Sequence, residues 1–235
     1  MLLRRPFGTS PVAARVVPFL VFLALTLAQS QFGETARYWL YLVKTLVGAW
    51  MIWEMRPWVA EMRWAVSAEA IAAGIGVFAL WVGFDGFYPH ISELGTRLGL
   101  GRAMGPGAAS PWNPLAQFGA QPALAWFFVT VRLAGASLVV PPLEEVFFRS
   151  FLYRYISQPD FQSVPTGRFR LGAFVLTSAV FAFEHEEWLS GLLCGFTYQA
   201  LVLRKQRLGD AITAHAITNV LLGLWVVVKG AWHFW

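Results

Sequence analysis

Long apolar runs with few charges limit most strongly how this chain can fold. Hydrophobic residues make up 57% of the 235 residues and charged residues only 13%, whereas a soluble domain carries about 25% charged residues. A helix of roughly 20 residues crosses the hydrocarbon core of a bilayer. Seven stretches approach this length, namely 16–32, 38–53, 64–84, 123–140, 171–183, 188–203 and 211–228. The sequence therefore predicts an all-α, polytopic transmembrane helix bundle with seven to eight membrane helices.

The charge pattern indicates which kind of partner the chain binds, and the single cysteine indicates how the bundle is stabilised. The net charge is +5, but the basic residues form no stripe with interleaved aromatics, so we expect no nucleic-acid partner and a lipid bilayer as the anionic surface. Cys194 has no partner for an intrachain disulfide, so the bundle depends on helix packing. The spacing of Gly191 and Gly195 favours close packing, either within the bundle or between protomers, and leaves the oligomeric state open.

The order of the apolar runs predicts one integrated membrane domain. Residues 1–122 would hold the N-terminal membrane helices and a Gly/Pro-rich loop from 85 to 121, which we interpret as a lid or an interfacial segment. Residues 123–235 would form the core. The first run, 16–32, resembles a signal peptide, but we interpret it as an uncleaved helix because a second apolar run follows almost at once.

The distribution of basic residues predicts the orientation. With a cytoplasmic N-terminus and with 141–170 kept on the cytoplasmic side, twelve basic residues lie on the cytoplasmic side and four on the opposite side, while Lys44 and Arg132 lie within apolar runs. This agrees with the positive-inside rule. We therefore expect a multi-pass protein with a cytoplasmic N-terminus. The same arrangement predicts that a short helix bearing the first motif below enters the interior from the cytoplasmic end without spanning.

Two adjacent glutamates form the first polar motif. Pro141 and Pro142 are expected to break the preceding helix, and Glu144-Glu145-x-x-x-Arg149 to open a new one. Glu145 and Arg149 stand at i,i+4, the spacing of an ion pair on one helical face. Glu144 lies about 100° round the helix and is free for chemistry. The alternative is a pair of solvated glutamates at a helix start.

Two further motifs place histidines in apolar surroundings. Phe181-x-x-x-His185 ends one apolar run, and His215-x-x-x-Asn219 lies on one face of another. Leaving such groups unpartnered in lipid costs several kcal/mol, so we expect them to face a polar interior. There they would either form hydrogen bonds between packed helices or belong to a functional site. A glutamate, two histidines and an amide together suffice to activate water and to stabilise an oxyanion.

These three motifs, in this order, resemble those of the CAAX prenyl endopeptidase and bacteriocin-processing (CPBP, or Abi) membrane protease family, over roughly 123–228. The resemblance implies a glutamate-type intramembrane endopeptidase without a cofactor. In it, Glu144 and His185 activate the attacking water, and His215 and Asn219 donate hydrogen bonds to the oxyanion. Glu145, Arg149 and Phe181 would support the site. The chain also resembles a bacterial branch found beside exosortase sorting systems, which implies the inner membrane.

Several alternatives remain at this stage. A zinc protease is disfavoured because Leu189 stands where His-Glu-x-x-His needs its second histidine. A non-catalytic partner or scaffold of a protein-sorting system would use the same polar groups for binding only. A transporter would account for the intramembrane charges Lys44, Glu69 and Arg132, but no inverted repeat supports it. Lys44 and Glu69 would either pair with each other or line a hydrophilic cavity. The expected substrate is a membrane-associated protein or peptide, prenylated or not.

Overall fold

The chain folds into a bundle of helices. The computed structural model describes residues 4–29, 31–100 and 111–235, and these contain helices and connections but no strand. The helices are α1 (Arg4–Thr9), α2 (Pro11–Gln29), α3 (Ala36–Met55), η1 (Ala60–Met62), α4 (Ala68–Gly83), α5 (Ile91–Arg97), α6 (Pro114–Gln117), α7 (Pro122–Ala134), η3 (Gly135–Val139), α8 (Val140–Glu145), η4 (Val146–Leu152), α9 (Tyr153–Ser157), η5 (Phe161–Ser163), α10 (Leu171–Ala182), α11 (Trp188–Lys205), α12 (Gly209–Lys229) and η6 (Trp232–Phe234).

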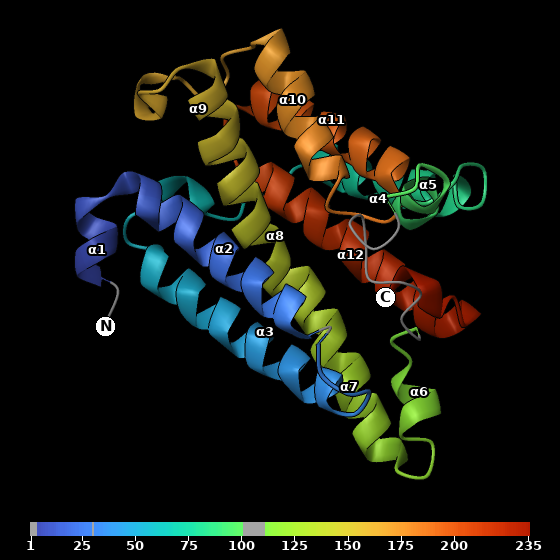
Figure 1. Cartoon of the computed structure of the whole chain (residues 1–235). Coiled ribbons are helices and arrows are strands. Elements are labelled where there is room, and N and C mark those ends of the chain that lie inside the picture. The colour runs from blue at the N-terminus through green and yellow to red at the C-terminus, as the bar shows by residue number, and fades with distance from the viewer. Residues whose placement is uncertain (1–3, 30, 101–110) are drawn as a thin grey trace.

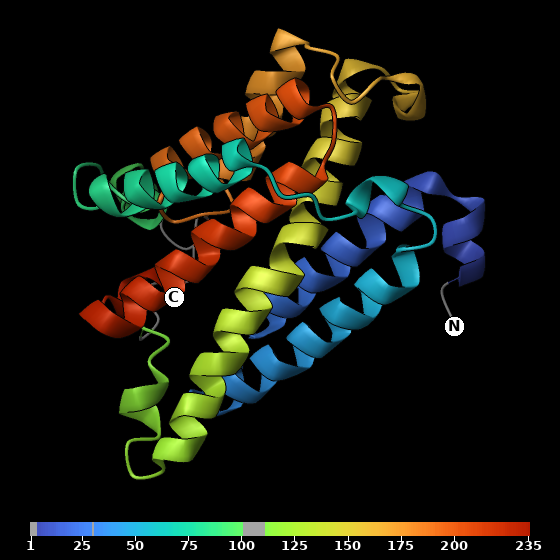
Figure 2. The ribbon, with the colours of Figure 1, turned by 180° about the vertical axis from the view of Figure 1, so that it is seen from behind.

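The helices fall into two groups on either side of one long helical rod. Figures 1 and 2 show α2 and α3 side by side against the rod that runs from α7 to α9. On the other side, α4, α10, α11 and α12 pack together, with α12 against both α4 and the rod. Six of the seven apolar runs correspond to helices whose ends lie within about five residues of the expected ones, and the run 123–140 begins as expected but is part of a longer helix.

The rod corrects the expectation of a separate short motif helix. Residues Pro122–Ser157 form one continuous helix of 36 residues, so Pro141 and Pro142 do not break it. A proline ring normally clashes with the carbonyl four residues earlier. Here the preceding segment η3 is π-helical, and its wider turn, with hydrogen bonds spaced by five residues, accommodates the prolines. A second π-helical segment, η4, follows the two glutamates directly.

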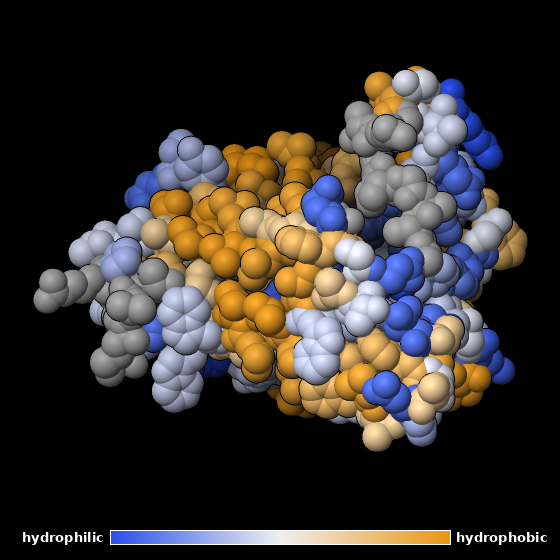
Figure 3. Space-filling view, turned by 60° about the horizontal axis from the view of Figure 1, so that its bottom comes forward, coloured by the Kyte–Doolittle hydropathy of each residue, from blue (hydrophilic) through white to orange (hydrophobic). Residues whose placement is uncertain are grey.

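The surface fits an integral membrane protein. Three helices are long and apolar enough to cross a bilayer, namely Pro11–Gln29, Pro122–Ser157 and Gly209–Lys229, and α4 and α10 are shorter apolar helices. The expected count of seven to eight crossings is therefore not confirmed. Figure 3 shows hydrophobic residues covering a broad, continuous part of one face. A water-soluble monomer rarely exposes so large an apolar area.

Two glycines of α11 allow this helix to pack closely against α10. A Cβ built at Gly191 would lie 3.1 Å from Cα of Ala182, and one at Gly195 would lie 2.9 Å from Cβ of Ser178. These two glycines of α11 therefore pack against α10, so the expected glycine pattern serves packing within the bundle.

The intramembrane charges Lys44 and Glu69 do not pair. The Lys44 ammonium donates to Thr26 Oγ1 at 3.1 Å, and the Glu69 carboxylate pairs with Lys205 at 3.1 Å. In the loop from 85 to 121, the described part contains the short helices α5 and α6. Gly101, Gly105, Pro106 and Gly107 lie outside the described residues, and the role of the loop as a lid stays a prediction.

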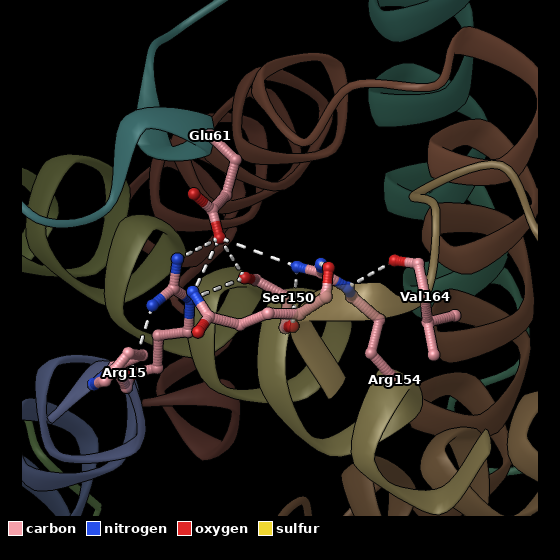
Figure 4. A network of polar contacts seen from close by, with 7 residues as sticks. Arg15, Glu61, Ser150, Arg154 and Val164 are labelled. Atoms are coloured by element: carbon pink, nitrogen blue, oxygen red, sulfur yellow. Dashed lines mark hydrogen bonds and ion pairs between the residues drawn. The ribbon is translucent and has the colours of Figure 1, made fainter. Parts of the chain in front are cut away.

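A partly buried polar network ties α2 and η1 to η4 and α9. Figure 4 shows Oε1 of Glu61 between Arg15, Ser150 and Arg154. Arg15 Nη2 donates to it at 2.7 Å, the Ser150 hydroxyl donates to it as well, and Arg154 Nη1 lies 3.8 Å away. Arg154 Nε also donates to the carbonyl of Val164 at 2.9 Å. Burial alone would raise the pKa of Glu61, but the Arg15 guanidinium and the Ser150 hydroxyl outweigh it and lower that pKa.

Candidate active site

All of the expected catalytic side chains meet at one cavity. The cavity lies between the rod and α12, with an empty volume of about 730 Å³ including its open part. Its lining contains the four residues expected to act on the substrate together with the expected supporting phenylalanine, namely Glu144, His185, His215, Asn219 and Phe181. Three separate parts of the chain, α8, the end of α10 with its following turn, and α12, thus contribute to a single polar pocket.

The two glutamates of α8 differ as expected. The Glu145 side chain is fully buried, and its Oε2 lies 3.3 Å from Nε of Arg149, which confirms the i,i+4 ion pair. The contact is a close charge pair without aligned hydrogen bonds, since Glu145 Oε2 and the three guanidinium nitrogens have no hydrogen-bond partner. The Phe181 ring lies 4.3 Å below the guanidinium carbon and provides a cation–π contact. Glu144 turns toward the cavity instead, and none of the residues that the structure describes donates a hydrogen bond to its Oε2.

The structure adds a role for Glu145 that the sequence does not predict. Its Oε1 lies 3.0 Å from Nδ1 of His215, 70 positions further along the chain. A carboxylate only accepts, so Nδ1 carries the proton. The opposite ring nitrogen, Nε2, lies 3.9 Å from Oε2 of Glu144. Glu145 therefore fixes both the tautomer and the orientation of His215. No local pattern could indicate this contact, because it depends on how α12 crosses α8.

The second motif fixes the tautomer of His185. Nδ1 of His185 lies 2.9 Å from the carbonyl oxygen of Phe181, and since a carbonyl only accepts, Nδ1 is the donor. In the neutral ring this leaves Nε2 as a free acceptor. The i,i+4 spacing of the motif explains the contact, because the carbonyl lies one turn earlier at the end of α10. The edge of the Trp81 ring packs against the imidazole, with centroids 5.2 Å apart.

Asn219 is held by the π-helical part of the rod. Its Nδ2 donates to the carbonyl of Ala136 in η3 at 2.7 Å. This is the helix-packing bond that was one of the two expectations for the residue. An amide carries two N–H donors, so one remains available toward the cavity that Asn219 lines.

Three residues that line the cavity extend the site beyond the motifs. The Tyr198 hydroxyl donates to Thr218 Oγ1 at 2.7 Å, and Thr218 donates to the carbonyl of Gly74 at 2.8 Å. This chain links α11, α12 and α4 behind His215. Arg132, which stands three turns before Glu144 on the rod, also lines the cavity. Within 4–29, 31–100 and 111–235, no three His, Cys, Asp or Glu side chains form a cluster that could hold a metal ion.

The comparison with protein families matches the part of the chain that builds this cavity. Residues 121–221 match the family described as type II CAAX prenyl endopeptidase, Rce1-like. No curated protein and no solved structure matches the chain. The matched residues include the paired glutamates, both histidines and the asparagine. Residues 121–221 are thus similar to the Rce1-like type II CAAX prenyl endopeptidases, a family of membrane proteases.

Proposed function

We propose that this protein is a glutamate-type intramembrane endopeptidase that hydrolyses a peptide bond of a membrane-associated protein or peptide. One observation supports it most: a glutamate without a hydrogen bond on Oε2 shares a cavity with two histidines whose Nδ1 atoms are both engaged. In each neutral ring, Nε2 is then the available atom. The type of chemistry agrees with the family that residues 121–221 match.

In the proposed mechanism, Glu144 and His185 activate water. A carboxylate and an imidazole Nε2 both accept, so together they can orient a water molecule and take its proton as the oxygen attacks the scissile carbonyl carbon. The proton then passes to the departing amide nitrogen, which completes the hydrolysis. Phe181 supports this step by holding His185 in the required tautomer through its carbonyl oxygen.

His215 and Asn219 are proposed to stabilise the tetrahedral oxyanion. Because Glu145 accepts the Nδ1 proton of His215, Nε2 is the ring atom left for the oxyanion, and it donates there in the doubly protonated ring. The remaining N–H of Asn219 supplies a second donor. Removing one donor of this kind lowers kcat by about 100- to 1,000-fold.

The test is comparative proteomics of membranes that contain the wild type, Glu144→Gln or Glu186→Gln. Glutamine keeps the shape of Glu144 and removes the base, so we expect the shortened substrate terminus to disappear. Glu186 is exposed in the turn after α10 and serves as the matched control, with processing unchanged. Processing that persists in a folded Glu144→Gln protein would reject the proposal and favour a scaffold that only binds its partner.

The zinc alternative is separated by chelation. The proposed mechanism needs no cofactor, so activity should survive exhaustive treatment with a chelator. Loss of activity that added zinc restores would instead assign the glutamates and histidines to a metal.

A further inference from the structure

Arg132 is a cation that lines the cavity, and within the described residues no carboxylate pairs with it. Its guanidinium carbon lies 4.9 Å from the ring centroids of Tyr41 and Trp112 and 5.6 Å from that of Trp235. The ionisable groups that act on it are two tyrosines and the cations Arg37 and Lys44, and no carboxylate of the described chain is among them. The Tyr41 hydroxyl donates to the backbone carbonyl of Arg132 at 3.3 Å.

Holding a guanidinium among aromatic rings and other cations costs free energy unless it binds an anionic ligand. Aromatic faces attract a cation but offer no lone pairs to its five N–H groups. The cations Arg37 and Lys44 both add repulsion. Ionisable residues at membrane depth are costly and are by default a functional-site hypothesis. The planar guanidinium fork fits a carboxylate with two parallel hydrogen bonds.

The position of Arg132 relates it to the proposed chemistry. It precedes Glu144 by twelve residues on one continuous helix, which corresponds to a rise of about 18 Å. An extended peptide advances about 3.3 Å per residue, so about five residues cover this rise. Arg132 and Glu144 both line the cavity, so such a peptide could contact both of them within it.

We infer that Arg132 binds a carboxylate of the peptide substrate, within about five residues of the scissile bond. The carboxylate is either the C-terminal one or the side chain of an aspartate or glutamate. Arg132 is then a specificity-determining residue at one end of the cavity, and the aromatic rings around it keep the guanidinium in place. This inference rests on the proposed function for the position of the scissile bond, but binding can be measured without cleavage.

The experiment measures binding to the Glu144→Gln protein by isothermal titration calorimetry in detergent. The probes are N-acetylated pentapeptides of alanine and leucine in three forms: a free C-terminus, a C-terminal amide, and an amide with glutamate as the last residue. We expect one or both carboxylate probes to bind about 10- to 100-fold more tightly than the plain amide, the range for a hydrogen bond to a charged group. The form that gains identifies the source of the carboxylate.

Variants then assign the preference to Arg132. Arg132→Gln should abolish it, and Arg132→Lys should keep only a small part because it lacks the fork. Lys44→Met removes the neighbouring cation and should leave the preference intact. Equal binding of acid and amide probes by the Arg132-containing protein would overturn the inference without any variant having to fold. Carboxylate preference without cleavage by the wild type would instead contradict the proposed function alone.

Discussion

The packing of α4 against α12 predicts that glycine-to-alanine substitutions at two positions of α4 change the stability in opposite directions. A Cβ built at Gly74 would lie 2.6 Å from the carbonyl oxygen of Ala214 and 2.8 Å from Cβ of Ile217. Neither atom can rotate away, because one is backbone and the other is bound directly to it. Gly76 lies on the same helix with nothing within 4 Å of its added Cβ. Gly74→Ala and Gly76→Ala are therefore the same chemical change in two surroundings.

The expected magnitudes follow from these distances. Alanine at an open helical position gains about 0.5–1 kcal/mol over glycine, and Gly76→Ala should show this gain. At Gly74 the clash costs about 1–3 kcal/mol. Moving α4 away also weakens the 2.8 Å bond from Thr218 to the Gly74 carbonyl, about 0.5–1.5 kcal/mol. We expect a net loss of about 1–3 kcal/mol.

The assay is thermal unfolding in one detergent, followed by the loss of helical circular dichroism. For a chain of this size each kcal/mol shifts Tm by roughly 2–4 °C, so Gly74→Ala should melt about 2–12 °C lower and Gly76→Ala slightly higher than the wild type. Since Ala214 precedes His215, cleavage should fall only in the first variant. Equal shifts in the two variants, or a rise in Tm for Gly74→Ala, would refute the packing argument.

Three further predictions concern buried polar groups. Glu145→Gln leaves Arg149 without its partner and should lower the free energy of unfolding by about 3–5 kcal/mol; combined with Arg149→Met the loss should be less than additive, and additive losses in a double-mutant cycle would contradict the ion pair. Folding lowers the pKa of Glu61, so its ionised form contributes stability that is present above the unfolded pKa and is lost as pH falls through the folded value. The stability difference between the wild type and Glu61→Gln, measured by denaturation from pH 7 down to pH 3, should therefore shrink on acidification, and a constant difference would exclude this linkage. Tyr198→Phe deletes the bond to Thr218 and should cost about 0.5–1.5 kcal/mol, read as a lower Tm in detergent.

Periodic and local features were predictable from the sequence. The apolar runs gave the helices, and the i,i+4 spacings gave the Glu145–Arg149 pair and the shared face of His215 and Asn219. The Phe181–His185 contact is also local in the chain. Each of these depends only on helix geometry, which a sequence encodes directly.

The features that were predicted wrongly, or not predicted, from the sequence depend on tertiary structure. Pro141 and Pro142 signal a helix break, yet the π-helical turn before them keeps the rod intact. The bond from Glu145 to His215 requires two helices to cross at one level. Lys44 and Glu69 find Thr26 and Lys205 as partners because their helices do not bring them together. Backbone adjustments and crossing angles of this kind leave no periodic trace in a single sequence.

The π-helical segment η3 sets the angular phase of the rod. In an ideal α-helix twelve residues leave Arg132 and Glu144 about 120° apart, but both line the same cavity. A π turn holds more residues than an α turn and so rotates less per residue, which brings the two side chains back toward one face. If one residue were deleted from 135–139 and the segment wound as an α-helix, eleven residues would separate Arg132 from Glu144, which places them about 20° apart. The π turn therefore absorbs one extra residue in the rod, and a one-residue deletion there should keep both side chains on the cavity face.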